Sequence, residues 1–275
     1  MKNLYEALET FGGRNGRYVA RHLEACGIHD FEDCTTSNIA EWVAYLKDKV
    51  APSSARTYVA VFKSTIKRYA ESGRVPCGDI TEMFRVRAEK PQKVYLTEEE
   101  LAKFEQVPIK SVKELYAKLA FLISAKTGMR ISDTSRVTME NVRDGMLTYV
   151  SKKTNKEAKV PVSDKVVGWI IAINTIHEIP NLANLELALK RLCKRAGIDT
   201  KVKLFRAGKT TTKPKYEFVT SHTARVTFCT IMTQKGVPVM DTCMMAGHST
   251  PAMTERYIIR TAPKLNEAAL KYLSE

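Results

Sequence analysis

Apolar residues recur at helical spacing along nearly the whole of this chain, which restricts the fold to a mainly helical class. Only two short segments, 146–151 and 158–162, alternate apolar and polar residues as half-buried β-strands do. A polar loop over 152–157 joins them. We therefore expect a mainly α-helical protein that contains a small β-sheet.

The 275 residues are enough for two modest domains, each with its own core. In the N-terminal part, the periodicity predicts helices over 17–26, 37–50 and 53–72. A weakly patterned segment rich in proline and charge follows, and it ends at Lys90-Pro-Gln-Lys93. We place the domain boundary there, which gives an N-terminal helical domain of residues 1–90 and a C-terminal domain of residues 91–275.

The C-terminal part shows clear start and stop signals for helices. Thr97 and Glu100 form a capping-box signature for a helix through Gln106. Gly128 ends the next helix, so Arg130 is expected on the turn that follows it. The predicted helices beyond Gln106 are 112–126, 166–174, 182–196, 222–234, 238–246 and 250–258. The segment 201–215 has no apolar period and is predicted to be a loop.

The charge balance points to a polyanionic partner. Lysine and arginine number 44 against 30 acidic residues, a formal net charge of +14, which favours nucleic acid. A general solubility charge and anionic lipid are the alternatives. No apolar run approaches the ~18 residues of a membrane span, and the first ten residues carry acids instead of a signal-peptide core. We expect a cytoplasmic protein without membrane association.

The cysteines and carboxylates argue against a metal centre. The six cysteines are scattered, with no Cys-x-x-Cys and no cysteine–histidine cluster, so we expect reduced thiols. No carboxylate cluster suits two metal ions, and we expect no cofactor. Cys229 is a conceivable nucleophile, although packing in a helical core is the more frequent role of such a residue.

Residues suited to phosphate chemistry gather in one C-terminal segment. His222-Thr-Ala-Arg225 is followed by Gly247-His248 and, nine residues after that histidine, by Tyr257. Imidazole and guanidinium groups can hydrogen-bond phosphodiester oxygens, and a phenolate can attack phosphorus. Taken singly, each residue is more often an ordinary helix-surface, turn or core residue.

A second segment upstream makes a shared site the better interpretation. Thr127-Gly-Met-Arg130-Ile-Ser-Asp133 offers another arginine with an acidic neighbour, and the lysine-bearing loop follows it. The order of these elements, and not only their identity, resembles that of the tyrosine recombinases of the phage integrase family. The resemblance covers roughly residues 95–260. The matching residues are Arg130 (first arginine), Asp133 (its acidic companion), Lys153 (hairpin lysine), His222 and Arg225 (His-x-x-Arg), His248 (later histidine) and Tyr257 (nucleophile).

Three positions depart from the family's pattern. Lys152 stands beside Lys153, so which lysine reaches the phosphate is open, and we prefer Lys153 because a threonine follows it. Val226 occupies a position that is histidine in many members, and Met245-Ala246 replaces the commoner leucine. Neither site belongs to the chemistry.

The resemblance implies a fold, an activity and partners. The fold would be a two-domain clamp, with an N-terminal SAM-like core-binding domain and a C-terminal catalytic domain. The activity would be site-specific cleavage and rejoining of double-stranded DNA through a 3′-phosphotyrosine, without metal or ATP. A tetramer on two DNA sites would act in integration, excision or inversion of a mobile element of a prokaryote or phage. Accessory DNA-bending proteins are further candidate partners.

The family also implies a role for each residue. Tyr257 would attack, Arg130 and Arg225 would neutralise the phosphate, and His222 would be the general base. Lys153 would protonate the departing 5′-hydroxyl, and His248 would hydrogen-bond the phosphate. In the family, a tail helix such as the apolar stripe of 266–273 docks on a neighbouring subunit, whereas the stripe alone would more often pack on its own domain. The composition of the 201–215 loop, apart from the family, favours a loop that faces DNA over a solvated connection.

Two other functions stay open. A type IB topoisomerase shares the tyrosine chemistry but would relax supercoils with little site preference. A non-catalytic DNA-binding regulator on the same scaffold would bind without cleavage. All six catalytic positions are filled, which favours the recombinase.

Overall fold

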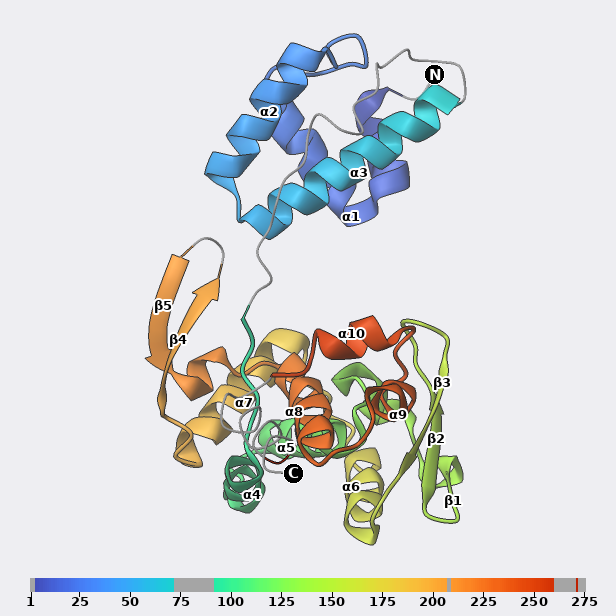
Figure 1. The fold of residues 1–275 in the computed structure, drawn as a ribbon, viewed down its shortest axis with the longest axis vertical. Coiled ribbons are helices and arrows are strands. Elements are labelled where there is room, and N and C mark those ends of the chain that lie inside the picture. The colour runs from blue at the N-terminus through green and yellow to red at the C-terminus, as the bar shows by residue number, and fades with distance from the viewer. Residues whose placement is uncertain (1–2, 72–91, 207–208, 260–270, 272–275) are drawn as a thin grey trace. The chain divides into compact units, whose positions relative to one another are not determined.

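The computed structural model describes residues 3–71, 92–206, 209–259 and residue 271. The chain divides into two compact units, Met1–Gln92 with Phe205–Thr211, and Lys93–Leu204 with Thr212–Glu275. Helices predominate in both units, as the periodicity predicts, and strands are few (Figure 1). None of the helices in the described ranges is both long enough and apolar enough to cross a membrane.

In its described part, the first unit has helices α1 (Leu4–Glu24), α2 (Thr36–Lys49) and α3 (Pro52–Glu71) around Trp42, whose ring lies 5.1 Å from that of Phe62. Helix α1 begins well before the predicted residue 17. Asn3 caps it by accepting a hydrogen bond from the Glu6 amide, and a kink at Gly13 (φ 54°) interrupts the apolar period there. The cap of α2 is Thr35, two residues before the predicted Ser37.

The second unit is built around α5 (Val112–Thr127), which is buried almost all round and packs against α6, α7 and α8. This burial is typical of a central helix. The capping box at Thr97 and Glu100 is confirmed at the start of α4. The other helices of this unit are α4 (Glu98–Gln106), α6 (Asp164–Asn174), α7 (Leu182–Arg195), α8 (Ser221–Gln234), α9 (Val239–Met245) and α10 (Pro251–Glu255).

Two predicted strands are confirmed as β2 (Met146–Val150) and β3 (Glu157–Pro161). They pair antiparallel, with the buried Leu147 opposite Val160, and β1 (Val142–Arg143) extends the sheet to the order β1-β2-β3. The 3₁₀ helices η1 (Ile131–Arg136) and η2 (Met139–Asn141) link α5 to this sheet. The polar turn between β2 and β3 is thereby fixed on the same unit as Arg130.

The predicted loop over 201–215 is wrong. This segment forms a second antiparallel pair, β4 (Lys201–Arg206) and β5 (Lys209–Pro214), followed by the 3₁₀ helix η3 (Lys215–Phe218). Leu204 lies in a small buried cluster with Val94 and Phe218. Backbone pairing and this one cluster hold the strands, so no apolar alternation marks them in the sequence.

The predicted helix over 250–258 is too long, because α10 ends at Glu255 and Tyr257 lies in the turn beyond it. Of the predicted tail helix over 266–273, only residue 271 is described. Lys90 and Pro91 of the predicted boundary, and Cys77, lie outside the described residues.

Candidate active site

Helix α8 places His222 and Arg225 three residues apart, on one face. The turn into the helix is fixed by the Thr223 hydroxyl, which accepts a hydrogen bond from the Thr220 amide at 3.0 Å. Both side chains line a cavity of about 440 Å³. The two residues of the His-x-x-Arg pattern therefore form part of one wall of a cavity.

Arg225 is buried, with 1% of its surface exposed, and two of its three nitrogens donate hydrogen bonds inside the protein. Its Nε donates to Nε2 of His248 at 3.1 Å, and its Nη1 donates to the Gly128 carbonyl at 2.7 Å. Its Nη2 is buried and forms no hydrogen bond of normal geometry. The buried Tyr149 phenol lies close by: burial raises the pKa of Tyr149 to about 12, and the Arg225 guanidinium offsets part of that rise. A buried donor without a partner is costly, so Nη2 is the unsatisfied point of this hydrogen-bond network.

Gly128 ends α5 with a left-handed backbone, φ 74°. A Cβ at this position would lie 2.5 Å from the ring of Phe228 on α8. Only glycine therefore allows α5 and α8 to approach closely while the carbonyl faces Arg225. This explains the glycine of the upstream arginine segment in physical terms.

His248 follows Gly247, whose φ of 61° turns the chain after α9. The imidazole is buried, and its Nδ1 lies 2.8 Å from the Thr254 hydroxyl. Since Nε2 accepts from Arg225, Nδ1 carries the proton and donates to Thr254. Both ring nitrogens are thus engaged, and the predicted hydrogen bond to a phosphate would require Nε2 to exchange partners.

Tyr257 lies against the two histidines. Its ring centroid is 4.9 Å from that of His222 and 4.8 Å from that of His248, and the Arg225 guanidinium carbon is 5.7 Å from it. The Tyr257 amide donates to the Thr254 carbonyl at 2.8 Å, and the Thr230 hydroxyl donates to the Tyr257 carbonyl at 3.2 Å. The backbone of the phenol-bearing residue is therefore attached to both α10 and α8.

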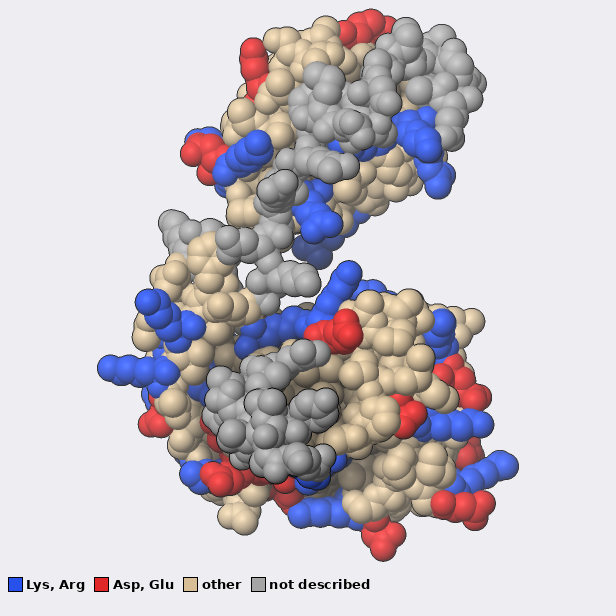
Figure 2. Space-filling model, in the orientation of Figure 1, with Lys and Arg blue, Asp and Glu red and all other residues tan. Residues whose placement is uncertain are grey.

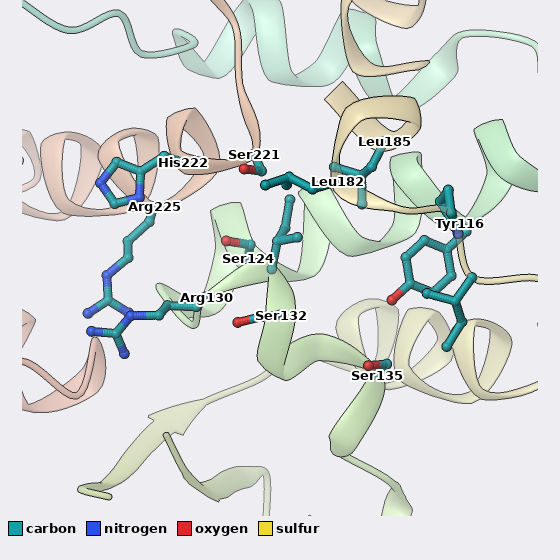
Figure 3. Close-up of a pocket in the computed structure, with 13 residues that line it drawn as sticks. Tyr116, Ser124, Arg130, Ser132, Ser135, Leu182, Leu185, Ser221, His222 and Arg225 are labelled. Carbon is teal, nitrogen blue, oxygen red and sulfur yellow. The ribbon is translucent and has the colours of Figure 1, made fainter. Parts of the chain in front are cut away.

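Arg130 stands at the start of η1, where its Nη1 donates to the Ser151 hydroxyl at 2.5 Å. It lines the same cavity as His222 and Arg225, and Figure 3 shows the two guanidinium groups side by side. The far part of the cavity is lined by Tyr116 and by leucines of α7. Two adjacent guanidinium groups repel each other unless an anion lies between them, so this end of the cavity suits a phosphate.

The two lysines in the turn between β2 and β3 are less closely connected to the other residues of the site. Lys152 and Lys153 are both exposed in the turn after β2. The Lys152 amide donates to Oδ1 of the buried Asp133 at 3.4 Å, and Asp133 also pairs with Arg136 at 3.6 Å. The positive charge of Lys153 contributes to the low pKa of His222. The choice between the two lysines stays a prediction.

Burial and neighbouring cations keep both histidines neutral. Burial, followed by the charges of Lys93, Arg225, Arg130 and Lys153, lowers the pKa of His222 to about 4. Burial, followed by the charges of Arg225 and Arg130, lowers the pKa of His248 to about 3. An anion bound between the arginines would offset this repulsion and raise both pKa values. The site is therefore electropositive and contains neutral imidazoles.

The structure brings Arg130, His222, Arg225, His248 and Tyr257 together and leaves Lys153 at longer range. Sequence reasoning missed the groups that hold them. These groups are Ser151, Thr254, the Gly128 carbonyl and Lys93. A single serine, threonine or lysine carries no pattern of its own, and only its place beside a recognised residue could have drawn attention to it.

Comparison with known proteins places this geometry in a family. The model of the phage integrase family matches residues 94–262, more than half of the chain, and the chain belongs to that family. The integrase of Escherichia phage P2 is 35% identical over 86 residues, which are 31% of this chain. That match spans about a quarter of the phage protein, 24% of its length.

Solved structures share the fold at low sequence identity. A lambda integrase dimer bound to a COC′ core site aligns with a TM-score of 0.69 at 18% identity, over 95% of this chain and 97% of that one. The XerH site-specific recombinase bound to a palindromic difH substrate aligns with a TM-score of 0.66 at 16% identity, over 94% and 76%. The Tn1549 transposon integrase, in complex with transposon right end DNA, gives 0.66 at 15% identity, over 100% of both chains.

Proposed function

We propose that this chain is a site-specific DNA recombinase that cleaves and rejoins strands through a 3′-phosphotyrosine on Tyr257. The observation that carries the proposal is the contact of the Tyr257 ring with His222 and His248 beside Arg225, whose Nη2 is a buried donor with no hydrogen bond of normal geometry. A phenol that would be the nucleophile, a neutral imidazole that would be the base and a guanidinium that would bind the phosphate thus lie close together.

The scissile phosphate would bind between the two arginines. Arg225 and Arg130 line the same cavity, so both guanidinium groups would face the non-bridging oxygens. Arginine stays protonated, so both side chains would neutralise the charge that builds on the phosphate in the transition state. The bonds of Arg225 to Gly128 and His248 fix its orientation before DNA binds.

Proton transfer would use His222 and Lys153. A phenol with a pKa near ~10 must lose its proton as it attacks, and His222 is neutral and adjacent to Tyr257. The negative phosphate would raise the pKa of His222 and make it a stronger base. As the Tyr257 oxygen bonds to phosphorus, the bond to the 5′-oxygen breaks, and Lys153 would supply the proton that this oxygen takes up.

DNA and further copies of the chain are the proposed partners. The chain carries a formal charge of +14, and Figure 2 shows lysine and arginine side chains on the visible surface of each unit. In the first unit, α3 presents exposed Arg56 and Lys67, which suit phosphate contacts. A similar fold is seen in a lambda integrase tetramer bound to a Holliday junction, with a TM-score of 0.64 at 16% identity, and we infer a tetramer on two duplexes.

The test is covalent trapping. Nicked duplexes made from the DNA on either side of the encoding gene would be incubated with wild type, with Tyr257→Phe and with a matched control, Tyr216→Phe, which alters another half-buried tyrosine of the same unit. We expect a denaturant-stable DNA adduct with wild type and the control, and none with Tyr257→Phe.

Other outcomes would replace the proposal. An adduct of equal yield with Tyr257→Phe would show that another residue attacks. Relaxation of supercoiled DNA without site preference would indicate topoisomerase activity. Sequence-specific binding by all three proteins, with no adduct on any duplex, would indicate a non-catalytic regulator.

A further inference from the structure

Lys93, the first residue of the second unit, contacts the nucleophile segment twice. Its Nζ lies 4.1 Å from the centroid of the Tyr257 ring, and the same ammonium donates to the Arg256 carbonyl at 2.8 Å. That carbonyl belongs to the peptide group immediately before Tyr257. One side chain therefore holds both the ring and the backbone of a residue that lies more than 160 positions along the chain.

The backbone that carries Lys93 is fixed independently of Tyr257. Val94 is buried with Leu204 and Phe218, and the fully buried Leu96 donates its amide hydrogen to the Thr227 hydroxyl of α8 at 3.0 Å. The segment is therefore anchored to the core of the unit on the C-terminal side of Lys93. A lysine at the end of an anchored segment can position what it contacts.

The chemistry of the contact suits positioning better than solvent exposure. Lys93 is half-buried, and burial lowers its pKa. An ammonium over an aromatic face is attracted by the ring electrons, and the attraction grows as water is excluded. The imidazole of His248 also stacks on this ring, at an interplanar angle of 27°. The orientation of the phenol is thus set by a cation as well as by an imidazole.

We propose that Lys93 is a positioning residue for the nucleophile, which holds Tyr257 in the orientation that faces His222 and His248. The inference rests on the function proposed above. Without Lys93, the ring would keep its contact with His248 and the backbone its bond from Thr230, so the unit would fold while the phenol oxygen became less well placed. Displacement of a reacting group by about 1 Å can reduce a rate by ~10²-fold.

The first arm of the test measures single-turnover adduct formation at saturating nicked DNA. Lys93→Met keeps the length of the side chain without its charge and hydrogen bonds, and we expect it to slow cleavage by about tenfold with an unchanged Kd for DNA. Lys93→Arg retains a cation and donors and should restore most of the rate. Lys103→Met, at an exposed lysine of α4, controls for net charge and should match wild type.

The second arm does not depend on catalysis. Trypsin can cut after the exposed Arg256, and in wild type the carbonyl of that scissile bond accepts from Lys93. In DNA-free Lys93→Met, a new N-terminus at Tyr257 should form several-fold faster than in wild type or Lys103→Met. Lys93→Gln, which can still donate to the carbonyl, should fall between the two and serves if Lys93→Met fails to fold.

The two arms separate the possible failures. Wild-type rates of cleavage and proteolysis in Lys93→Met would overturn the positioning role. Slower cleavage that is wholly accounted for by weaker DNA binding would make Lys93 a DNA contact instead and would also overturn it. If wild type forms no adduct on any duplex, the proposed function fails, and an unchanged rate of cutting after Arg256 would then still reject the Lys93 contact.

Discussion

The two sides of the candidate site are held in different ways. On the α8 side, Arg225 and His248 are 1% and 5% exposed and form a chain of hydrogen bonds from Gly128 to Thr254. On the hairpin side, Arg130 is half-buried with a bond to Ser151, and Lys153 is exposed in a turn. The side chains on the α8 side are therefore fixed before any ligand binds. Those on the hairpin side can still move, and we propose that bound DNA fixes them.

This difference separates stability from catalysis. A buried polar network costs free energy whenever one member is removed, because its partners lose their hydrogen bonds in a low dielectric. Charged groups at the rim keep their solvation and contribute little to stability. Substitutions on the two sides should therefore damage activity alike and stability unequally.

The largest expected effect is that of Arg225→Ala. This change leaves the Gly128 carbonyl and Nε2 of His248 without their donor and opens a cavity, so the free energy of unfolding should fall by about 2–4 kcal/mol. If Arg225 stabilises the transition state as proposed, its loss should reduce single-turnover adduct formation by at least ~10²-fold. Urea denaturation and adduct kinetics measure the two effects.

Arg130→Ala is the matched comparison. It should reduce adduct formation as strongly, because Arg130 lines the same end of the cavity, yet change the free energy of unfolding by less than about 1 kcal/mol. Equal destabilisation by the two substitutions would contradict the difference between the two sides.

The next-largest effect should be a loss of stability of the fold at acid pH, caused by the two histidines of the α8 side. The pKa values of His222 and His248 in the folded protein are about 4 and about 3, below the ordinary 6.5. Below pH 6.5 the unfolded chain therefore binds protons that the folded chain excludes, so the stability contributed by these histidines is complete above pH 6.5 and falls as the pH drops toward 4. Urea denaturation at successive pH values measures how steeply the free energy of unfolding changes with pH.

Substitutions assign that slope to the site. His222→Asn removes one of the two histidines that take up a proton on unfolding. The free energy of unfolding should therefore depend less steeply on pH between 6.5 and 4. His177→Asn, at an exposed histidine, should leave the slope as in wild type. An unchanged slope in His222→Asn would mean that His222 titrates normally and that its surroundings are less electropositive than the contacts indicate.

Periodicity predicted the fold well where burial is one-sided and continuous. Helix α7 and the strands β2 and β3 were found because their buried residues repeat at regular spacing, whereas α5 is buried almost all round and was marked by the glycine at its end. It failed where other forces hold the chain. The kink at Gly13 masked the first half of α1, and backbone pairing with one buried leucine holds β4 and β5 without alternation.

The site was predictable in identity but not in arrangement. The order of its arginines, histidines and tyrosine indicated a shared phosphate site, and the structure does gather five of the six residues. No pattern could show that Arg225 bonds a glycine carbonyl 97 positions away or that Tyr257 lies beyond the end of α10. Such contacts depend on how α5 approaches α8, which local sequence does not encode.

The smallest effect should come from Ser151→Ala on the hairpin side. The buried Ser151 hydroxyl accepts a hydrogen bond from Arg130, so its loss frees the guanidinium without removing it. Because a bound phosphate can itself orient Arg130, we expect adduct formation to slow by only about threefold to tenfold, with unfolding free energy lowered by less than about 1 kcal/mol. Thr148→Ala, at a half-buried hydroxyl on the strand β2 that leads to Ser151, is the control and should keep the wild-type rate.

The comparison between the two sides turns on the size of this loss. If Ser151→Ala reduced cleavage as much as Arg130→Ala does, the orientation of Arg130 would be set by the protein and not by the ligand. The hairpin side would then be as fully organised before DNA binding as the α8 side, and its exposure would reflect access for the duplex instead of freedom to adapt. A rate within tenfold of wild type, together with an unchanged rate for Thr148→Ala, supports a site that the phosphate itself completes.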